Sequence, residues 1–355
     1  MGRVRTVMGG IATPLPERAS DTDLGFQSSV LDGPLPDALR GGVLAIGNFD
    51  GVHCGHQAVI GEALKLARAK EKPCQVLSFE PHPRSFFQPA VPVFRLTPPK
   101  DKARVLAAFG IDGLLTLPFN AALAATSAED FITHYLLDWA GAAHVVTGFN
   151  FYFGTKRMGT PEVLKAAGEQ RGFGVTVLDA HGFEEEFGAT GDPVSSSRIR
   201  DALTQAETDR AAHLLGYRWT VSGTVVKGAQ LGRTLGYPTA NLKLPDSTTL
   251  AHGIYAVRFR RADGSLHDGV ASFGRRPTFD NGAPLLETFL FGFSGDLYGE
   301  TVVVSLFDFL RGEEAFDSAE ALVEQMDRDS IEARKKLAAA SPLSHLDERL
   351  SFDGR

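Results

Sequence analysis

The sequence predicts two domains: a Rossmann-like α/β domain with a doubly wound parallel sheet, followed by a closed antiparallel β-barrel with a C-terminal helix. Three features of the 355 residues support this arrangement. Up to residue 178, apolar strand-like runs alternate with helical patterns. From residue 217 onward, short strand-like runs alternate with turn residues, and a charged amphipathic pattern covers residues 318–337. Alternating strands and helices favour a parallel sheet, whereas several short strands joined by turns favour a barrel.

In the first part, strands are expected where apolar runs are bounded by polar or turn residues. A helical pattern follows each run, with apolar residues recurring at three- and four-residue spacing. After the second run, Pro81 and Pro83 are expected to stop regular structure, because proline removes a backbone donor and restricts its neighbour. The expected strands are residues 43–46, 75–79, 113–117, 144–147 and 175–178.

In the second part, short β-branched and aromatic runs are separated by turn residues. Asp263 and Gly264 form a dipeptide typical of hairpin turns, so the runs on either side are expected to pair antiparallel. The expected strands are residues 220–226, 254–260, 269–272, 285–291 and 301–309.

These patterns divide the chain into a probable disordered extension (residues 1–24), the α/β domain (25–208), the barrel domain (209–342) and a tail (343–355). The net charge of −7 argues against a general nucleic-acid-binding protein, which would normally be basic. Cys54 and Cys74 are the only cysteines, which indicates no disulfide framework and fits a cytoplasmic protein. No apolar run approaches the ~20 residues that a membrane helix needs. The oligomeric state is left open.

One stretch organises the first domain: residues 47–57, with the sequence Gly-Asn-Phe-Asp-Gly-Val-His-Cys-Gly-His-Gln. It lies between the first expected strand and the first expected helix. The free N–H groups of a helix N-terminus favour anions such as phosphate, and His53 and His56 add imidazole donors there. Gly55 has no Cβ, so a ligand can approach the backbone closely. Cys54 without a Cys-x-x-Cys pair is poor evidence for zinc.

Other polar groups are expected at the same edge of the sheet, because parallel strands bring ligand sites to their carboxyl ends. His82 follows the second strand and Asn150 follows the fourth. A run of serines with Arg198 and Arg200 begins a later helix, where arginine can grip phosphate with two parallel hydrogen bonds. An N-capped surface helix with solvated arginines is the alternative for that run.

The barrel domain contains a glycine-rich loop, residues 227–241, that could wrap a phosphate chain with backbone N–H groups. It does not follow the Walker pattern, because no Gly-x-x-x-x-Gly-Lys-Ser/Thr string occurs in the chain.

These motifs resemble a known family. His-x-Gly-His after a first strand resembles the signature of the nucleotidylyltransferase superfamily, and the full residue 47–57 string resembles the adenylyl-transfer domain of bifunctional riboflavin kinase/FAD synthetases. The loop ending in Pro-Thr-Ala-Asn resembles the flavokinase loop. The resemblance covers residues 31–337. It implies a bacterial-type enzyme whose barrel phosphorylates riboflavin to FMN and whose α/β domain adenylylates FMN to FAD and releases pyrophosphate, using ATP and Mg²⁺.

The resemblance also implies residue roles. His53, His56 and Arg198 would stabilise charge during adenylyl transfer, and Glu287 would be the base toward the ribityl hydroxyl of riboflavin. Thr239 and Asn241 would hold Mg²⁺ and the ATP phosphates, since Mg²⁺ accepts neutral oxygen ligands. The residues implied in nucleotide or flavin binding are Gly47, Asn48, Phe49, Asp50, Gly55, His82, Asn150, Ser196, Ser197, Lys227, Gly228, Gly232, Arg233 and Pro238.

The sequence departs from the common family pattern at a few positions. Asn150 and Tyr152 stand where Asp and Arg are frequent, and Ser197 stands for Thr but keeps the hydroxyl. Phe289 and Gly292 stand where His and Asp are frequent. These departures leave alternatives open: an FAD synthetase with impaired kinase activity, or a flavin-binding module without catalysis.

Two further enzyme classes share part of the signature. A transferase with another acceptor, such as a pantetheine or nicotinate nucleotide, would not need the barrel or the Pro-Thr-Ala-Asn loop. A class I aminoacyl-tRNA synthetase would want a Lys-Met-Ser-Lys-Ser loop, which is absent from the sequence.

Overall fold

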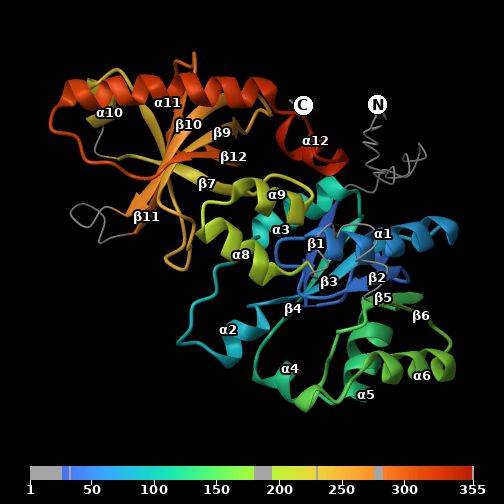
Figure 1. The fold of residues 1–355 in the computed structure, drawn as a ribbon. Helices are drawn as coiled ribbons and strands as arrows, with labels where there is room; N and C mark the ends of the chain where they lie inside the picture. Colours follow the sequence, from blue (N-terminus) through green and yellow to red (C-terminus); the bar gives the residue numbers. More distant parts are fainter. Residues whose placement is uncertain (1–25, 32, 180–193, 229–230, 276–282, 354–355) are drawn as a thin grey trace, which may run out of the picture.

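The computed structural model describes residues 26–31, 33–179, 194–228, 231–275 and 283–353. The extension expected at residues 1–24 lies outside this range. Two lobes lie side by side: an α/β lobe built from the first half of the chain and a β-barrel built from the second (Figure 1). Both parts of the predicted fold class are confirmed.

The α/β lobe is built on a six-stranded sheet in which every pairing is parallel, in the order β1-β4-β3-β2-β5-β6. The chain enters the sheet centre at β2, moves to β3 on one side and later returns to β5 on the other. That reversal leaves a crevice at the carboxyl ends of β2 and β5, where ligands bind in open α/β sheets. The strands are β1 (Gln27–Val30), β2 (Val43–Ile46), β3 (Cys74–Glu80), β4 (Gly113–Pro118), β5 (His144–Gly148) and β6 (Gly174–Leu178).

Residues of the central strands alternate between two apolar clusters, so both faces of the sheet are buried. Val43 and Ala45 pack on the side of α1 and α3, whereas Leu44 and Ile46 pack on the side of the wide helical segment η2 and of α6. This explains the continuous apolar run of β2. The helical segments of this lobe are η1 (Asp37–Leu39), α1 (Cys54–Ala69), α2 (Pro83–Phe87), α3 (Pro99–Phe109), α4 (Ala121–Ala125), α5 (Ala128–Asp130), η2 (Phe131–Trp139), η3 (Thr155–Arg157), α6 (Pro161–Arg171), α8 (Ser196–Thr204) and α9 (Thr208–Leu215).

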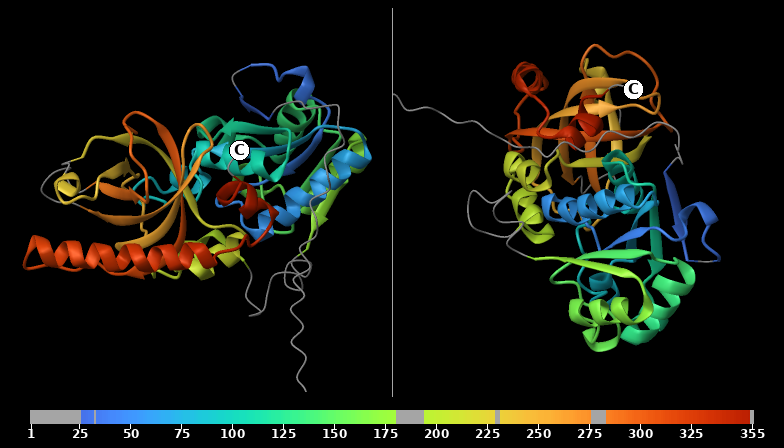
Figure 2. Two further views of the ribbon diagram at one scale, coloured as in Figure 1. Left: turned by 90° about the horizontal axis from the view of Figure 1, so that it is seen from above. Right: turned by 90° about the vertical axis from the view of Figure 1, so that its right-hand side faces the viewer.

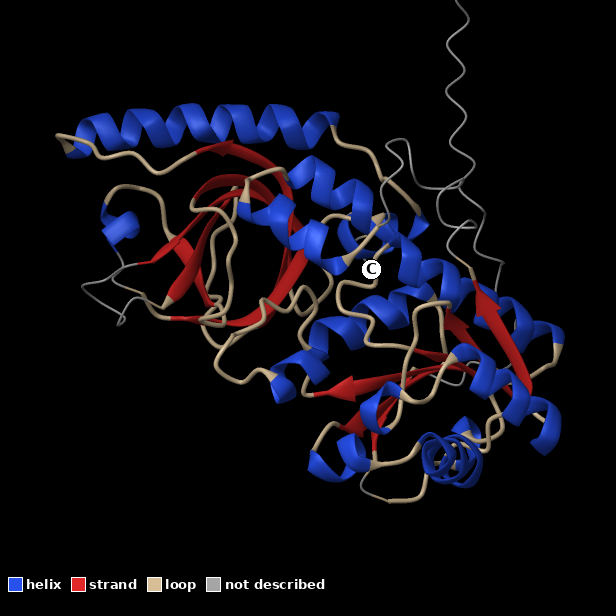
Figure 3. Cartoon of the chain, turned by 60° about the horizontal axis from the view of Figure 1, so that its bottom comes forward, coloured by secondary structure: helices blue, strands red, loops and turns tan. Residues whose placement is uncertain are grey.

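The second lobe is a closed barrel with strand order β10-β11-β8-β7-β12-β9, and its described pairings are antiparallel. The long helix α11 runs along the outside of the barrel (Figure 3). Gly264 takes the positive φ of +86° in the turn between β9 and β10, as its Asp-Gly sequence predicts. The elements are β7 (Thr220–Val226), α10 (Leu231–Thr234), β8 (Thr239–Lys243), β9 (Gly253–Arg260), β10 (Leu266–Arg275), β11 (Pro284–Leu290), β12 (Thr301–Arg311), α11 (Ala319–Ala339) and α12 (His345–Ser351).

Several elements were not expected from the sequence. The barrel strand β8 begins at Thr239, within the segment that was expected to be a glycine-rich loop. β1 is a half-polar strand at the edge of the described sheet, where it pairs with β4, so it lacks the apolar run of a central strand. α2 begins at Pro83, where the prolines were expected to stop regular structure; proline suits the first position of a helix, and the His82 side chain caps it. α12 lies within the expected tail and buries Leu346 and Leu350 in the main core.

The two lobes share one continuous hydrophobic core, and α8, α9 and α12 lie at the junction between them (Figure 2). Tyr217, just before the barrel, donates a hydrogen bond from its hydroxyl to the carbonyl oxygen of Gly51 (2.7 Å). The Trp219 indole donates to the carbonyl of Leu96 (2.8 Å) and packs edge-on against the Phe94 ring. The residues at the start of the barrel therefore stabilise the loop that follows β2, through Tyr217, and the segment before α3, through Trp219. Within the described residues, no helix combines the length and apolar character needed to cross a bilayer.

Candidate functional site

A cavity of about 1100 Å³ opens at the carboxyl ends of β2, β3 and β5. Most of the side chains predicted from the sequence to bind nucleotide or flavin in this domain meet there. Asn150, which follows β5, also lines it. The predicted residues that line the cavity are Gly47, Asn48, Phe49, Asp50, His53, Gly55, His56, His82, Asn150, Ser196 and Ser197.

His53 does two things at the start of α1. Its Nδ1 accepts a hydrogen bond from the backbone N–H of His56 (3.3 Å), so it caps the helix. Because Nδ1 is the acceptor, the ring proton of the neutral imidazole lies on Nε2. Burial lowers the pKa of His53 to about 4, against the opposing effect of the Asp50 carboxylate. His53 is therefore a neutral hydrogen-bond donor at pH 7, not a cation.

His82 repeats this arrangement at the start of α2. Its Nδ1 accepts from the backbone N–H of Arg84 (3.1 Å), and burial together with Arg95 lowers the pKa of His82 to about 4. The His56 ring stacks on that of His53 with centroids 3.6 Å apart. Burial, His53 and the Lys102 ammonium hold the pKa of His56 well below its usual value. The cavity thus presents a group of neutral imidazoles.

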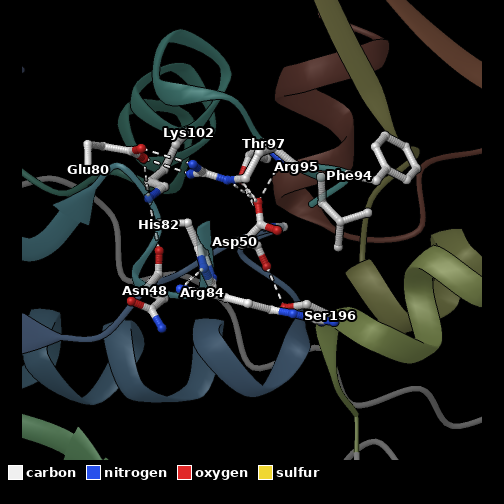
Figure 4. A network of polar contacts seen from close by, with 12 residues as sticks. Asn48, Asp50, Glu80, His82, Arg84, Phe94, Arg95, Thr97, Lys102 and Ser196 are labelled. Atoms are coloured by element: carbon white, nitrogen blue, oxygen red, sulfur yellow. Dashed lines mark hydrogen bonds and ion pairs between the residues drawn. The ribbon is translucent and has the colours of Figure 1, made fainter. Parts of the chain in front are cut away.

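Asp50 holds the loop between β2 and α1 (Figure 4). Its carboxylate is almost fully buried and accepts hydrogen bonds from the Arg200 guanidinium and from the backbone N–H of Thr97 (3.1 Å). Arg95 Nε lies 3.5 Å from the same carboxylate. The Ser196 hydroxyl donates to the Asp50 carbonyl oxygen (2.8 Å). The segment before α3 and helix α8 therefore grip the loop that carries the histidines.

Lys102 is a second support of this loop, and sequence reasoning missed it. Its buried ammonium donates to the Asn48 carbonyl (2.9 Å), the Ser78 hydroxyl (2.8 Å) and Glu80 Oε1 (3.2 Å). Arg95 binds Glu80 with two parallel hydrogen bonds of 2.9 and 2.7 Å. A signal did exist, because Lys102, like Asp101, is a charged residue at helical spacing with apolar positions of α3, in the case of Lys102 with positions 105, 106 and 109.

In this cluster, burial and the neighbouring charges shift the pKa values in opposite directions. Burial alone would raise the pKa of Glu80, but Arg95 and Lys102 outweigh it and hold that pKa below its usual value. Burial lowers the pKa of Lys102, against the opposing Glu80 carboxylate. The cluster is a mutually compensated set of buried charges, which is the condition under which charges are tolerated in an interior.

Helix α8 begins as predicted, with the Ser195 hydroxyl accepting from the backbone N–H of Arg198 (3.4 Å). The arginine of this helix that lines the cavity is Arg200, whereas Arg198 is not among the described lining residues. Arg84, Lys156 and Arg157 add three further cationic side chains to the wall. Among the described lining residues the only carboxylate is that of Asp50, which Arg200 and Arg95 compensate, so the cavity favours anions.

Two further side chains of the α/β lobe are informative: Tyr152, a departure from the family pattern, and Cys54, a candidate nucleophile. Tyr152, which stands where arginine is frequent, lies under the Arg157 guanidinium at 4.7 Å, so a cation is still present at this wall. Cys54 is buried and its thiol donates to the carbonyl oxygen of His213 (3.5 Å). Burial raises the pKa of Cys54 to about 12, which disfavours the nucleophilic thiolate.

The barrel has a separate cavity of about 530 Å³. Pro238, Thr239 and Asn241 of the Pro-Thr-Ala-Asn segment line it, together with residues 293–298. Asn241 pairs directly with Glu287 across β8 and β11, so the two side chains lie on the same face of the sheet. The buried Asn241 Oδ1 has no hydrogen-bond partner among the residues that the structure describes.

The described part of the glycine-rich loop lies close to these groups. A Cβ at Gly232 would come within 2.4 Å of the Tyr237 carbonyl oxygen, so this position requires glycine. A Cβ at Gly228 would come within 2.8 Å of the end of the Asn241 side chain and would displace it. Lys227 places its ammonium 5.7 Å from the centroid of the Tyr298 ring. The side chain of Arg233, predicted to bind nucleotide, lies outside the described residues.

The barrel departures have structural roles of their own. Phe289 packs against Tyr237 with ring centroids 4.7 Å apart and lies against the cluster beneath α11. Gly292 has a φ of +65° in the turn after β11, a conformation that glycine adopts without strain. In the described part of the chain, His, Cys, Asp and Glu do not gather in groups of three or more that could hold a metal ion.

Comparison with known proteins identifies both lobes. Residues 35–198 match the FAD synthetase family, and residues 215–337 match the riboflavin kinase family. Bifunctional riboflavin kinase/FMN adenylyltransferases from Listeria monocytogenes and Pseudomonas fluorescens are similar over most of the chain. The first is 37% identical over 82% of this chain and 91% of the relative, and the second 39% identical over 86% and 95%.

A solved structure described as a macrolide-efflux protein from Streptococcus pneumoniae has a similar fold, with a TM-score of 0.73 and 30% identity, covering 88% of this chain and 99% of that one. The order of the two matched domains agrees with the order of the α/β lobe and the barrel. The chain therefore belongs to the family of bifunctional riboflavin kinases/FMN adenylyltransferases.

Proposed function

We propose that FMN adenylylation takes place in the cavity at the end of β2 and that His53 and His56 are its central hydrogen-bond donors. The observation that carries this proposal is the pair of stacked, neutral imidazoles at the start of α1, in a cavity whose uncompensated side chains are cationic. Such a wall suits a triphosphate, and the N-terminus of the 16-residue helix α1 adds its own positive potential.

In this reaction a phosphate oxygen of FMN attacks the α-phosphorus of ATP, and the bond from that phosphorus to the bridging oxygen of pyrophosphate breaks. Negative charge grows on the oxygens around the α-phosphorus and on the leaving pyrophosphate. We assign the Nε2–H of His53 and the His56 ring to the transferring phosphate, and Arg200 with Arg198 to the phosphates at α8. Donors fixed before the reaction stabilise that charge without reorganising, so no protein nucleophile is required.

We place riboflavin phosphorylation in the barrel cavity, with Glu287 as the base that accepts the proton of the ribityl 5′-hydroxyl. Glu287 lies on the same face as Asn241, and the glycines at 228 and 232 allow the loop backbone to approach the phosphates. The departures from the family pattern at Phe289 and Gly292 leave all of these groups in place, so we expect the kinase to be active. A positioned base contributes about 10²–10⁴-fold to such reactions.

Mg²⁺ is the metal that the ligand chemistry of the barrel fits. Asn241 Oδ1 is a buried oxygen without a partner among the described residues, and Thr239 adds a hydroxyl at the same cavity. Mg²⁺ is commonly held by few protein oxygens while phosphates and water complete its shell. When bound, it would neutralise charge on the transferred phosphoryl group.

Cys54 and Cys74 are free thiols, which supports a reducing cytoplasm as the site of both reactions.

The adenylyl site can be tested separately from the kinase. In the double variant His53→Asn/His56→Gln, asparagine keeps a helix-capping oxygen while both imidazoles are lost. We expect FAD formation from FMN and ATP to fall at least about 100-fold, because removing one such donor typically costs 10²–10³ in kcat. FMN formation from riboflavin should stay at the parent rate. The exposed His134→Asn is the matched control. FAD formation at the parent rate would remove these imidazoles from the mechanism.

Stability should depend on pH through His53. Its pKa is about 4 in the folded protein and near 6.5 when unfolded, so the unfolded chain binds the proton first. This contribution to stability is complete above pH 6.5 and is lost as pH falls toward 4, at up to about 1.4 kcal/mol per pH unit. Urea unfolding should show a shallower pH dependence for His53→Asn than for the parent. Parallel curves for the two proteins would contradict the assignment.

The kinase assignment predicts that Glu287→Gln lowers FMN formation at least about 100-fold, because glutamine keeps the shape of the side chain but cannot accept the proton. FAD formation from supplied FMN should be unchanged, which also shows that the protein is folded. Glu332→Gln on α11 serves as the control, because Glu332 pairs with Lys335 on the same helix. Product chromatography of riboflavin, FMN and FAD against time measures both activities; retained FMN formation would exclude Glu287 as the base.

A further inference from the structure

One buried hydroxyl lacks a hydrogen-bond partner among the described residues of the barrel. Thr288 lies on β11 and is fully buried, and its Oγ1 makes no hydrogen bond within the part of the chain that the structure describes. Its neighbours on the same face, Leu286 and Leu290, belong to the interior core, and it pairs with Ala240 of β8, which is also interior. The Thr288 side chain therefore points into the barrel, where it lines the 530 Å³ cavity.

Leaving this hydroxyl unpaired opposes folding. Most buried side-chain polar atoms in proteins have a partner, and an unsatisfied one carries a desolvation penalty. Valine has the same branched shape and would fill this position without that penalty. Because this hydroxyl lies in the wall of a cavity, a bound ligand can supply the missing hydrogen bond.

The walls of the cavity indicate which part of a ligand reaches Thr288. The polar residues of the wall are Thr288, Thr239, Asn241, Ser294 and Asp296. Most of the other lining residues are apolar or aromatic, and that part of the wall suits a flat heterocycle rather than a phosphate. Thr239 and Asn241, which we assign to the phosphates and Mg²⁺, line the same cavity. A nucleotide whose phosphates meet these two residues would carry its base into the remaining space. The apolar and aromatic residues are Val225, Ala240, Leu290, Phe293, Leu297 and Tyr298.

We propose that the Thr288 hydroxyl hydrogen-bonds the adenine of ATP in the kinase cavity and so contributes to nucleotide selection. This proposal rests on the proposed kinase function. A threonine hydroxyl can both donate and accept, and the adenine edge offers an amino group and ring nitrogens. Sites that hydrogen-bond a substrate in this way discriminate against ligands that leave the buried group unpaired. The isoalloxazine ring of riboflavin is the other flat heterocycle in the reaction, and the experiment separates the two.

The test compares Thr288→Val, which removes the hydroxyl and keeps the shape, with Thr288→Ser, which keeps the hydroxyl. For the valine variant, KM for ATP in FMN formation should rise about three- to tenfold, the effect of one lost hydrogen bond. KM for riboflavin and kcat at saturating ATP should match the parent. The serine variant should retain a KM for ATP close to the parent value. FAD formation from FMN occurs in the other cavity and should be unchanged in both variants.

The melting temperature of the ligand-free protein provides an independent readout. Because the hydroxyl is unpaired before ATP binds, Thr288→Val should melt at or above the parent temperature. Melting below the parent would mean that the fold already satisfies the hydroxyl, and would overturn the proposal. An unchanged KM for ATP, or a rise in KM for riboflavin alone, would also overturn it. If FMN formation were absent even from the parent, the kinase function itself would fail instead.

Discussion

The buried carboxylate of Asp50 is the constraint on which the adenylyl site depends. The loop after β2 holds Phe49 and Val52 at positive φ values of 48° and 40°, a conformation that is costly for a β-branched residue. The loop keeps this shape because Arg200, Thr97 and Arg95 bind the carboxylate while Lys102 binds the carbonyl of Asn48. This conformation positions His53 and His56 so that both line the cavity.

This arrangement separates the groups that shape the site from the groups that meet the substrate. Asp50 and Lys102 are buried and Glu80 is partly buried. Arg200 and Arg95 compensate the two carboxylates together with Lys102, so this group holds the backbone and leaves little net charge of its own. The imidazoles are neutral, and the cations of the wall provide the attraction for anions. The barrel supports the same loop through Tyr217, so the two lobes form one folded unit while each keeps its own cavity.

The sequence was sufficient for the fold class, because central strands buried on both faces give clear apolar runs. Most of the residues that it singled out in the α/β domain line the first cavity, because the loops at the carboxyl ends of parallel strands meet at one edge. The edge strand β1 could not be found, because a strand half exposed to solvent has no such run. Which arginine of α8 lines the cavity depends on the orientation of that helix, which the sequence does not record. The capping by His82 and the unpaired hydroxyl of Thr288 depend on three-dimensional partners that no local pattern records.

The most direct test of the account is Asp50→Asn, assayed for both activities and for stability beside the exposed control Asp138→Asn. Removing one charge from a buried ion pair typically costs about 3–5 kcal/mol, so the free energy of unfolding should fall by roughly that amount. FAD formation should fall with it, because the histidine loop loses its anchor, while FMN formation continues at temperatures where the protein is folded. An Asp50→Asn protein with parental stability and parental FAD formation would contradict the central role of this carboxylate.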